Sequence, residues 1–411
     1  MKVVNIFNLL LVFSSVLCAC KHQVDTSNRS YFTFDLEDRH VAVSVQLDDS
    51  VTVKLGFDTG HFMGYEYELV ILDSGILSAN PSLSQKRVLG TAPMGTAWST
   101  TRYSAIFYDS MQLKLQLGRT DFIYSEIQAM PWKKLMNSTF TDGLFNIPKS
   151  DTTHVWELNF ENNYMEVHPA DDYEFPEDCT LLPLEVYDYC PFYVTLPLKV
   201  RFSDGDTLTI QQKFLIDTGA PRDMILLLEA EEQKCLHQRE DAVWLQDLGR
   251  YIRYYTVTGT LFDDLRLDSL RLYMLDYKNS VHHPYVVGLN FLKRFNVFFD
   301  MKNKRLGLQP LRRFERLVNP LYTRFHYSTR KSQDGRFIVD CVGDYKENYY
   351  KTAGLQVGDE IATIEGIPYG EITLEIANQL RLLETLVVGV VRNGKPQTLQ
   401  VKVDRNEPAG D

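Results

Sequence analysis

The sequence has no apolar run long enough to cross a bilayer and no dense run of basic residues. A membrane-spanning helix needs about 20 apolar residues. The apolar run at residues 6–16 covers only eleven positions, and these include Asn8, Ser14 and Ser15. Lys and Arg number 43 against 54 Asp and Glu, so the net charge is −11. Such a chain is poorly suited to bind phosphate backbones, and we expect no nucleic-acid partner.

Motifs for several common chemistries are also absent. The chain has six cysteines but no Cys-x-x-Cys pair, so a zinc ribbon is not supported. It has no Gly-x-Ser-x-Gly, no His-Glu-x-x-His and no phosphate-binding loop. His282 and His283 form an isolated pair before a proline, which is more typical of a solvated loop than of a metal site. We therefore expect no metal and no organic cofactor.

The N-terminal segment has the pattern of an export signal. Lys2 precedes the apolar run, which ends in Leu17-Cys18-Ala19-Cys20. This ending resembles a bacterial lipobox, in which the last cysteine receives diacylglycerol. By that resemblance residues 1–19 form a signal peptide, and lipid on Cys20 anchors the mature protein in the bacterial cell envelope, in the periplasm or at the surface. A plain secretory signal and a short membrane anchor are the alternatives.

The remaining cysteines leave the disulfide pattern open. An exported compartment favours oxidation, and Cys179 and Cys190 are 11 positions apart. With Cys235 and Cys341 they allow three full pairings, and four free thiols remain an alternative.

Beyond residue 30 the sequence predicts a mainly β protein. Hydrophobic residues make up 44% and charged residues 24%, as in ordinary globular domains. Most apolar runs are short and alternate with polar residues, as in residues 41–47, 111–117 and 196–202, which is the period of strands. Aromatic residues reach 12%, and they also favour sheets.

The chain resembles itself at a large offset, which predicts two homologous lobes. Two Asp-Thr-Gly triplets lie 159 residues apart, and the segments that close each half lie 141 residues apart. The recurring segments are 40–47, 51–60, 106–117, 142–147 and 156–167, followed by 191–202, 208–219, 261–272, 286–292 and 297–308. We predict β lobes at residues 20–170 and 191–311, joined by an acidic linker at residues 171–190.

Each Asp-Thr-Gly triplet follows an apolar strand and precedes an apolar-Gly-apolar turn, around Gly143 in the first half and Gly288 in the second. This pattern resembles aspartic proteases of the retropepsin and pepsin type, over about residues 30–310. The resemblance implies two pseudo-symmetric β-barrel lobes with Asp58 and Asp217 as the catalytic dyad at their interface. It further implies that Thr59 and Thr218 lock the two loops together, and that Gly60 and Gly219 allow the backbone to approach closely.

The chemistry explains why two carboxylates are needed. Two carboxyl groups about 3 Å apart cannot both ionise, so they share a proton and their apparent pKa values separate. The ionised member can then take a proton from a water while the protonated member polarises the scissile carbonyl.

Two features depart from the family pattern. His61 stands where the family has a small residue and where the second triplet has Ala220. Three interpretations of His61 are open. A protonated imidazole would lower the pKa of the dyad, a bulky ring would crowd the cleft, and an exposed loop histidine would do neither. Asp73-Ser74-Gly75 also follows an apolar run, so Asp73 competes with Asp58. Alignment of the two halves favours Asp58. Residues 95–103, with Trp98, and residues 249–255 are predicted to be lids.

A third segment follows a polar connector at residues 312–319. Residues 335–342 read as a strand, residues 374–383 as an amphipathic helix, and Asn393-Gly394 as a hairpin turn. The run Ala353-Gly-Leu-Gln-Val-Gly-Asp359 resembles a bacterial PDZ domain, which implies a small α+β domain at residues 320–406. PDZ domains bind an extended peptide and hold its terminal carboxylate, here near residues 325–328. A purely structural module is the alternative.

Together these patterns predict a lipid-anchored, cell-envelope aspartic endopeptidase that hydrolyses peptide or protein substrates. Its C-terminal domain would bind the C-terminus of a peptide. The rival hypothesis is a catalytically inactive pepsin-like lipoprotein that only binds peptides, and His61 is the residue that favours it. The internal repeat makes pairing with a second chain unnecessary.

Overall fold

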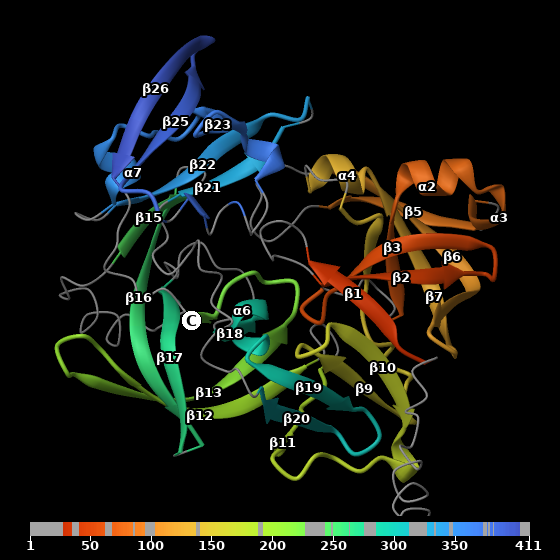
Figure 1. Ribbon diagram of the computed structural model, residues 1–411. Coiled ribbons are helices and arrows are strands. Elements are labelled where there is room, and N and C mark those ends of the chain that lie inside the picture. Colours follow the sequence, from red (N-terminus) through yellow and green to blue (C-terminus); the bar gives the residue numbers. More distant parts are fainter. Residues whose placement is uncertain are drawn as a thin grey trace, which may run out of the picture.

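Figure 1 shows the computed structural model of the chain. The structure describes residues 28–34, 41–61, 68–84, 87–94, 103–136, 140–187, 192–226, 243–247, 250–262, 264–274, 285–311, 327–332, 334–344, 348–372, 376, 379–380 and 382–402. The described part is mainly β, and none of its helices is long and apolar enough to span a membrane. Cys20, Trp98, Cys190, Cys235 and the connector at 312–319 lie outside the described residues.

The first half of the chain forms a closed barrel of six strands with one additional edge strand. In spatial order the strands are β2 (Val41–Leu47), β3 (Val51–Phe57), β8 (Gly143–Phe145), β4 (Leu69–Asp73), β7 (Thr120–Met130), β6 (Tyr103–Leu117) and the edge strand β5 (Arg87–Met94). Pairing of β2 with β6 closes the barrel. The described residues of this half include the short helices α2 (Ser74–Ala79), α3 (Pro81–Ser84) and α4 (Trp132–Leu135).

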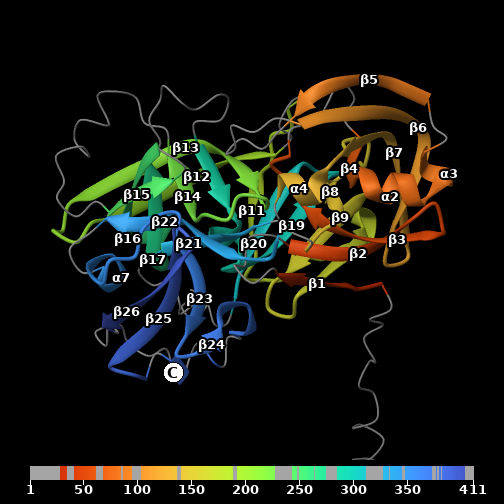
Figure 2. The ribbon, with the colours of Figure 1, turned by 90° about the horizontal axis from the view of Figure 1, so that it is seen from above.

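The second half repeats this topology. Its strands are β12 (Tyr193–Arg201), β13 (Thr207–Asp217), β18 (Tyr285–Gly288), β14 (Met224–Leu226), β17 (Leu265–Met274), β16 (Arg250–Leu261) and the edge strand β15 (Val243–Asp247). Pairing of β12 with β16 closes this barrel. In both halves the strand before the Asp-Thr-Gly triplet runs parallel to the strand that carries the later apolar segment. The fold therefore contains two pseudo-symmetric β barrels, which lie side by side in Figure 2.

A further sheet joins the two halves. Its strands are β11 (Thr180–Pro183), β20 (Arg305–Pro310), β19 (Phe295–Asp300), β9 (His154–Asn159), β10 (Tyr164–Pro169) and β1 (Ser30–Phe34). The two central strands, β9 and β19, come from the closing segments of the two repeats. They pair symmetrically, with Trp156 opposite Phe299 and Leu158 opposite Val297. One apolar core runs through both barrels and this sheet, and in it Trp156 stacks on Phe57 at 6.3 Å between ring centroids.

The C-terminal segment forms a small module with its own apolar core. Its elements are β21 (Tyr327–Lys331), β22 (Phe337–Asp344), α7 (Tyr349–Thr352), β23 (Glu360–Ile364), β24 (Ile367–Pro368), β25 (Thr385–Arg392) and β26 (Lys395–Lys402). Asn393 and Gly394 both have positive φ, 52° and 75°, which confirms the predicted tight hairpin between β25 and β26. Half of the predicted helix at 374–383 lies outside the described residues, and residues 376, 379 and 380 are helical.

One connection between the module and the barrels was not predicted. Strand β22 pairs with β15, the edge strand of the second barrel, with Trp244 opposite Asp344 and Leu245 opposite Gly343. The sheet of the second barrel therefore continues into the module, which places the blue module directly against β15 in Figure 1. The described residues also include the short helix α6 (Leu289–Leu292) and the 3₁₀ turns η1 (Ala170–Asp172) and η4 (Tyr369–Glu371).

Candidate active site

The two Asp-Thr-Gly triplets form equivalent loops at the ends of β3 and β13. In the first loop, Asp58 Oδ1 accepts a hydrogen bond from Gly60 N at 3.0 Å. In the second, Asp217 Oδ1 accepts hydrogen bonds from Gly219 N and Ala220 N, both at 2.9 Å. Backbone donors to a carboxylate favour its ionised form. Each loop thus binds one oxygen of its own aspartate and fixes the rotamer of that side chain.

Two threonines interlock the loops across the interface between the barrels. Thr59 N donates to Thr218 Oγ1 at 3.0 Å, and Thr218 N donates to Thr59 Oγ1 at 3.0 Å. The hydroxyl of Thr59 donates to Ile216 O at 2.8 Å, and that of Thr218 donates to Phe57 O at 2.8 Å. Both threonines are fully buried. This symmetric network holds the two loops in one relative position.

The glycines of the triplets allow the two aspartates to meet. A Cβ atom on Gly60 would lie 2.1 Å from Asp217 Cγ, and a Cβ atom on Gly219 would lie 2.3 Å from Asp58 Cγ. Non-bonded carbon atoms normally stay about 3.5–4.0 Å apart, so only glycine fits at either position. The structure therefore brings together all six residues of the triplets, with each carboxylate lying against the glycine of the opposite loop.

Burial and mutual repulsion make the pair a proton-sharing site. The pKa of Asp58 is raised well above its usual value by burial, by the charge of Asp217 and by a hydrogen bond with the Asp217 side chain. Backbone hydrogen bonds from Gly60 and His61 act in the opposite direction. Protons on such a pair belong to the pair and not to one residue. The geometry can therefore present one ionised and one protonated carboxyl group to a bound water.

Asp73 has a different role. It caps the N-terminus of α2, where its Oδ1 accepts a hydrogen bond from Gly75 N at 2.9 Å, and its Oδ2 accepts one from Lys133 N at 2.9 Å. A capping carboxylate satisfies backbone donors that the first turn of a helix leaves unpaired. The alternative that Asp73 replaces Asp58 in the dyad is therefore wrong.

The apolar-Gly segment is correctly placed in the second lobe only. Gly288 pairs with Asp217, and a Cβ atom there would lie 2.2 Å from Arg222 O. In the first lobe Gly143 pairs with Leu55, three positions before Asp58. The position equivalent to Gly288 is thus Asn146, whose Oδ1 accepts a hydrogen bond from Ile147 N at 2.7 Å. The sequence alignment of this segment was wrong by three residues.

Several residues that support the Asp217 loop were missed by the sequence analysis. Leu289 N donates to Ala220 O at 2.7 Å, and Asn290 Nδ2 donates to Pro221 O at 2.9 Å. Asp223 accepts hydrogen bonds through its backbone from Gly288 N and through its Oδ2 from Arg271 N, both at 2.9 Å. The only sequence signal for these residues is that they follow the triplet or the apolar-Gly segment directly.

His61 matches neither the protonated nor the exposed alternative. Its Nε2 atom is buried and has no hydrogen-bond partner among the described residues. Burial lowers the pKa of His61 from 6.5 to about 4, because a charged imidazole is costly away from water. The ring is therefore neutral above that pH and adds no positive charge beside Asp58.

These two pKa shifts predict opposite pH dependences of stability. His61 with a lowered pKa should cost stability as the pH falls from 6.5 towards 4, since only the unfolded chain binds the proton there. Asp58 with a raised pKa should cost stability as the pH rises above 3.8, since only the folded chain binds the proton there. Between the unfolded-state and folded-state pKa values of each group, the free energy of unfolding changes by about 1.4 kcal/mol per pH unit.

Denaturant unfolding at a series of pH values measures how His61 and Asp58 each change the free energy of unfolding with pH. Relative to the unsubstituted protein, His61→Ala should gain stability as the pH falls from 6.5 to 4. Asp58→Asn should gain stability as the pH rises above 3.8. Difference curves that stay flat across these windows would contradict the two assignments.

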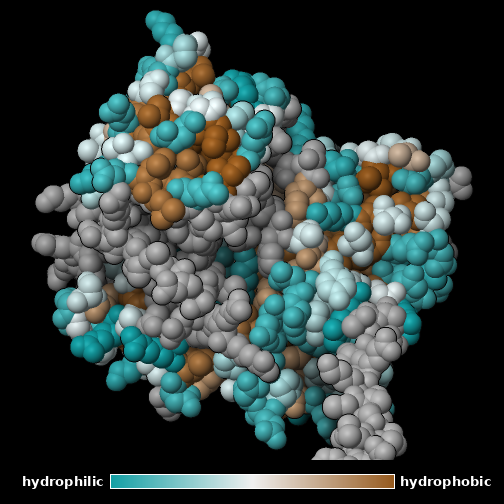
Figure 3. All heavy atoms as spheres, in the orientation of Figure 1, coloured by the Kyte–Doolittle hydropathy of each residue, from teal (hydrophilic) through white to brown (hydrophobic). Residues whose placement is uncertain are grey.

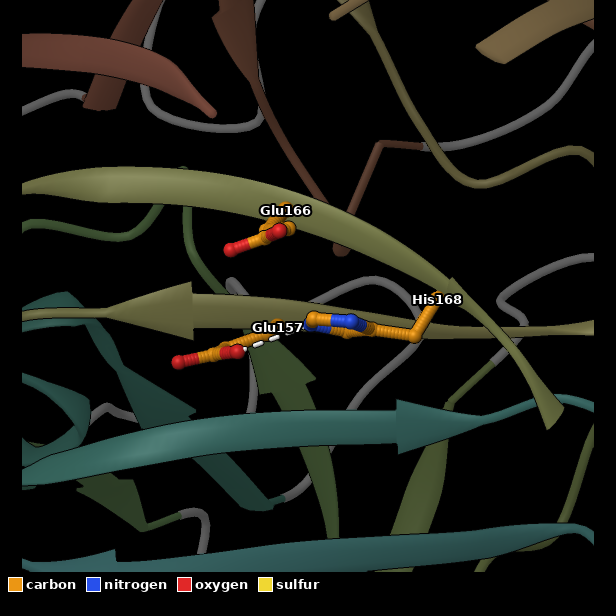
Figure 4. Close-up of side chains that lie close together, drawn as sticks. All are labelled: Glu157, Glu166 and His168. Atoms are coloured by element: carbon orange, nitrogen blue, oxygen red, sulfur yellow. Dashed lines mark hydrogen bonds and ion pairs between the residues drawn. The ribbon is translucent and has the colours of Figure 1, made fainter. Parts of the chain in front are cut away.

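A second cluster of ionisable residues lies on the sheet that joins the lobes (Figure 4). Glu157 and Glu166 face each other across β9 and β10, and His168 Nε2 lies 2.9 Å from Glu157 Oε2. Their ligand atoms are close enough to be considered as metal ligands. However, Glu166 already pairs with Arg29 at 2.9 Å, and Glu157 accepts hydrogen bonds from Asn159 and Tyr164. These partners account for two adjacent carboxylates without a cation.

Cys179 is a free thiol against Gly307, whose added Cβ atom would lie 2.8 Å from the sulfur. Burial raises the pKa of this thiol to about 12, so it is protonated at neutral pH. Cys190, the partner that the sequence allowed for Cys179, lies outside the described residues.

No protein-family model matches this chain. No curated protein sequence matches it either.

Proposed function

We propose that the protein is an aspartic-type endopeptidase of the bacterial cell envelope. The observation that carries this proposal is the dyad itself, in which Asp58 and Asp217 share a hydrogen bond between two interlocked loops. In the proposed reaction the ionised carboxylate takes a proton from water as the water attacks the scissile carbonyl. The protonated carboxyl group donates a hydrogen bond to the carbonyl oxygen as the tetrahedral intermediate forms. The carbon–nitrogen bond then breaks, and the proton taken from the water passes to the leaving amine.

The alternative function is peptide binding without catalysis. It was favoured by His61, because a charged imidazole would hold both aspartates ionised. A neutral, buried imidazole removes that objection. Retention of both aspartates also favours an enzyme, since a lobe that only binds peptides has no chemical need for a proton-sharing pair.

A peptide library tests the proposal directly. The soluble chain from residue 21 onward should cleave internal peptide bonds, and a pepstatin-like inhibitor should abolish that cleavage. Mass spectrometry of the products identifies the cleaved bonds. Tight binding of the inhibitor without cleavage of any peptide, across a range of acidic to neutral pH, would instead support the peptide-binding alternative.

We further propose that the C-terminal module is a PDZ-like domain that binds the C-terminus of a peptide. Its short α7, the turn through Gly354 and Gly358, and its antiparallel strands are compatible with this. Figure 3 shows apolar residues gathered on the visible face of the module. Its exposed large apolar side chains are Val357, Leu382, Leu383 and Val387, which suit an apolar peptide end.

Binding of such peptides should depend on their terminal carboxylate. In calorimetric titrations of the full chain against a library of apolar-ended peptides, we expect peptides with a free C-terminus to bind at least about tenfold more tightly than their amidated forms, because backbone N–H groups hold the carboxylate. Equal affinity of the two forms would contradict a PDZ-like site and support a structural module.

The proposed anchor is lipid on Cys20. Cys20→Ser should move the protein from the membrane fraction to the soluble fraction. The substitution removes the lipid, and the apolar run at residues 6–16 is too short to span the bilayer in its place. Fractionation followed by immunoblotting measures this, with the unsubstituted protein as control. A variant that stays with membranes in high salt would contradict lipid anchoring.

A further inference from the structure

The two edge strands of the barrels have different surroundings. Strand β5 of the first barrel pairs only with β6 among the described strands, whereas its counterpart β15 also pairs with β22 of the C-terminal module. Backbone pairing is directional, so it restricts both the position and the twist of an edge strand. Strand pairing therefore holds the β15–β16 hairpin against the module.

This hairpin leads directly to a buried aromatic pair. Val243 of β15 lies opposite Tyr254 of β16, and Tyr254 lies opposite Tyr273 of β17. The two tyrosine rings pack at 5.3 Å between centroids, and both residues are at most 5% exposed. They belong to one buried cluster with Ala220, the residue that follows the second Asp-Thr-Gly triplet.

The aromatic pair in turn contacts the loop of Asp217. The guanidinium of Arg222 lies over the Tyr273 ring at 4.5 Å from its centroid, a distance at which a cation is attracted to the ring face. Arg222 is five residues beyond Asp217, and between them Ala220 N donates its hydrogen bond to Asp217 Oδ1 at 2.9 Å. Strand pairing, the packed rings and the short chain segment from Arg222 to Ala220 thus link β22 to the Asp217 carboxylate.

The first lobe has no such stack at the equivalent positions. Strand register places Phe107 where the second lobe has Tyr254 and Gln128 where it has Tyr273. The Gln128 side chain is fully buried, and its amide atoms have no hydrogen-bond partner among the described residues. The support for Asp217 is therefore specific to the lobe that the module contacts.

We propose that the C-terminal module positions Asp217 through strand β15 and the Tyr254–Tyr273–Arg222 stack. In this role Tyr254, Tyr273 and Arg222 are positioning residues that do not contact substrate. Misplacement of a reacting group by about 1 Å can cost on the order of 100-fold in rate, so a modest shift of the loop would be measurable. The inference concerns regulation of the proposed catalytic site, but the position of the loop can be measured without catalysis.

The test breaks the connection at the module and at the stack separately. Gly343→Pro fixes the backbone φ and removes an N–H within the part of β22 that pairs with β15, and Gly343→Ala is its control because it retains that N–H. Tyr254→Leu removes one ring of the stack, and Tyr254→Phe retains it. Phe107→Leu is the matched control in the first lobe. All variants are made in the full soluble chain from residue 21.

Hydrogen exchange measured by mass spectrometry is the first readout. Gly343→Pro and Tyr254→Leu should both speed exchange of peptides covering residues 215–223 by at least about tenfold while peptides covering 55–60 stay unchanged. Gly343→Ala, Tyr254→Phe and Phe107→Leu should leave residues 215–223 as in the unsubstituted protein. The proposal would be overturned if Gly343→Pro left the exchange of residues 215–223 unchanged. It would also be overturned if Phe107→Leu sped that exchange as much as Tyr254→Leu does.

Peptide cleavage is the second readout. Gly343→Pro and Tyr254→Leu should each lower kcat about tenfold with little change in KM, and both should shift the pH profile of kcat/KM. The double variant should be no worse than either single one, since both break the same connection. A double variant whose loss of kcat equals the product of the two single losses would overturn the proposal. If the unsubstituted protein cleaves nothing, the proposed function fails, whereas the exchange measurements still decide this inference.

Discussion

Asp58→Asn and Asp217→Asn should each lower peptide cleavage by at least about 1000-fold while the protein stays folded. The dyad needs one ionised and one protonated carboxyl group, and an amide can be neither. Folding should survive, because an Asn side chain has nearly the same shape and retains an Oδ1 acceptor for Gly60 N or Gly219 N. Initial rates on a peptide identified from the library, together with thermal unfolding curves, measure the two effects.

Asp73→Asn is the matched control for this prediction. Asp73 also follows an apolar strand, but its carboxylate accepts hydrogen bonds from the backbone of Gly75 and Lys133. Asn retains the Oδ1 acceptor for Gly75 N but places an amide NH₂ against Lys133 N, so we expect near-normal cleavage and a loss of stability of about 1–3 kcal/mol. Cleavage that survives in Asp58→Asn and disappears in Asp73→Asn would reverse the assignment of the dyad.

Gly60→Ala and Gly219→Ala should each lower cleavage by about 100-fold or more, although neither glycine takes part in the chemistry. The new methyl group on residue 60 would lie 2.1 Å from Asp217 Cγ, and that on residue 219 would lie 2.3 Å from Asp58 Cγ. Each substitution must therefore displace the carboxylate of the opposite lobe. The displacement also breaks the hydrogen bonds that hold that carboxylate to its own loop.

Gly90→Ala is the control for the glycine variants. Gly90 lies on edge strand β5, and a Cβ atom there would meet no heavy atom within 4 Å, so we expect unchanged cleavage. Steady-state kinetics should show that the two triplet variants lose mainly kcat. Normal activity in Gly60→Ala and Gly219→Ala would mean that the two carboxylates do not meet as the structure places them.

The repeat in the sequence could be recognised because each half preserves the same order of local patterns. Alternation of apolar residues marks which side of a strand is buried, and the Asp-Thr-Gly triplets mark where two strands end. The error at Gly143 has the same origin. An apolar-Gly pattern indicates a close approach of the backbone, but it does not identify the partner, and Gly143 approaches Ile71 O while Gly288 approaches Arg222 O.

The sequence also could not determine the state of His61. An isolated histidine beside a catalytic motif is compatible with a charged, an exposed or a buried neutral ring. The choice depends on how much water the folded chain excludes from the imidazole, and here burial of Nε2 lowers the pKa to about 4. The same limit applies to Asp73, whose second hydrogen bond comes from Lys133 N, 60 residues away in the chain.

The sequence by itself determined the mainly β character, the two-lobe repeat, the pair of Asp-Thr-Gly loops and the tight turn at Asn393-Gly394, because these depend on residue type and local spacing. Alignment of the two halves already favoured Asp58 over Asp73, and the structure places Asp58 against Asp217. The tertiary structure alone decided that Asn146 occupies the position of Gly288 and that β22 joins β15. The physical reason is that any exposed strand edge can accept many partners. Which partner it takes depends on the packing of segments far apart in the chain.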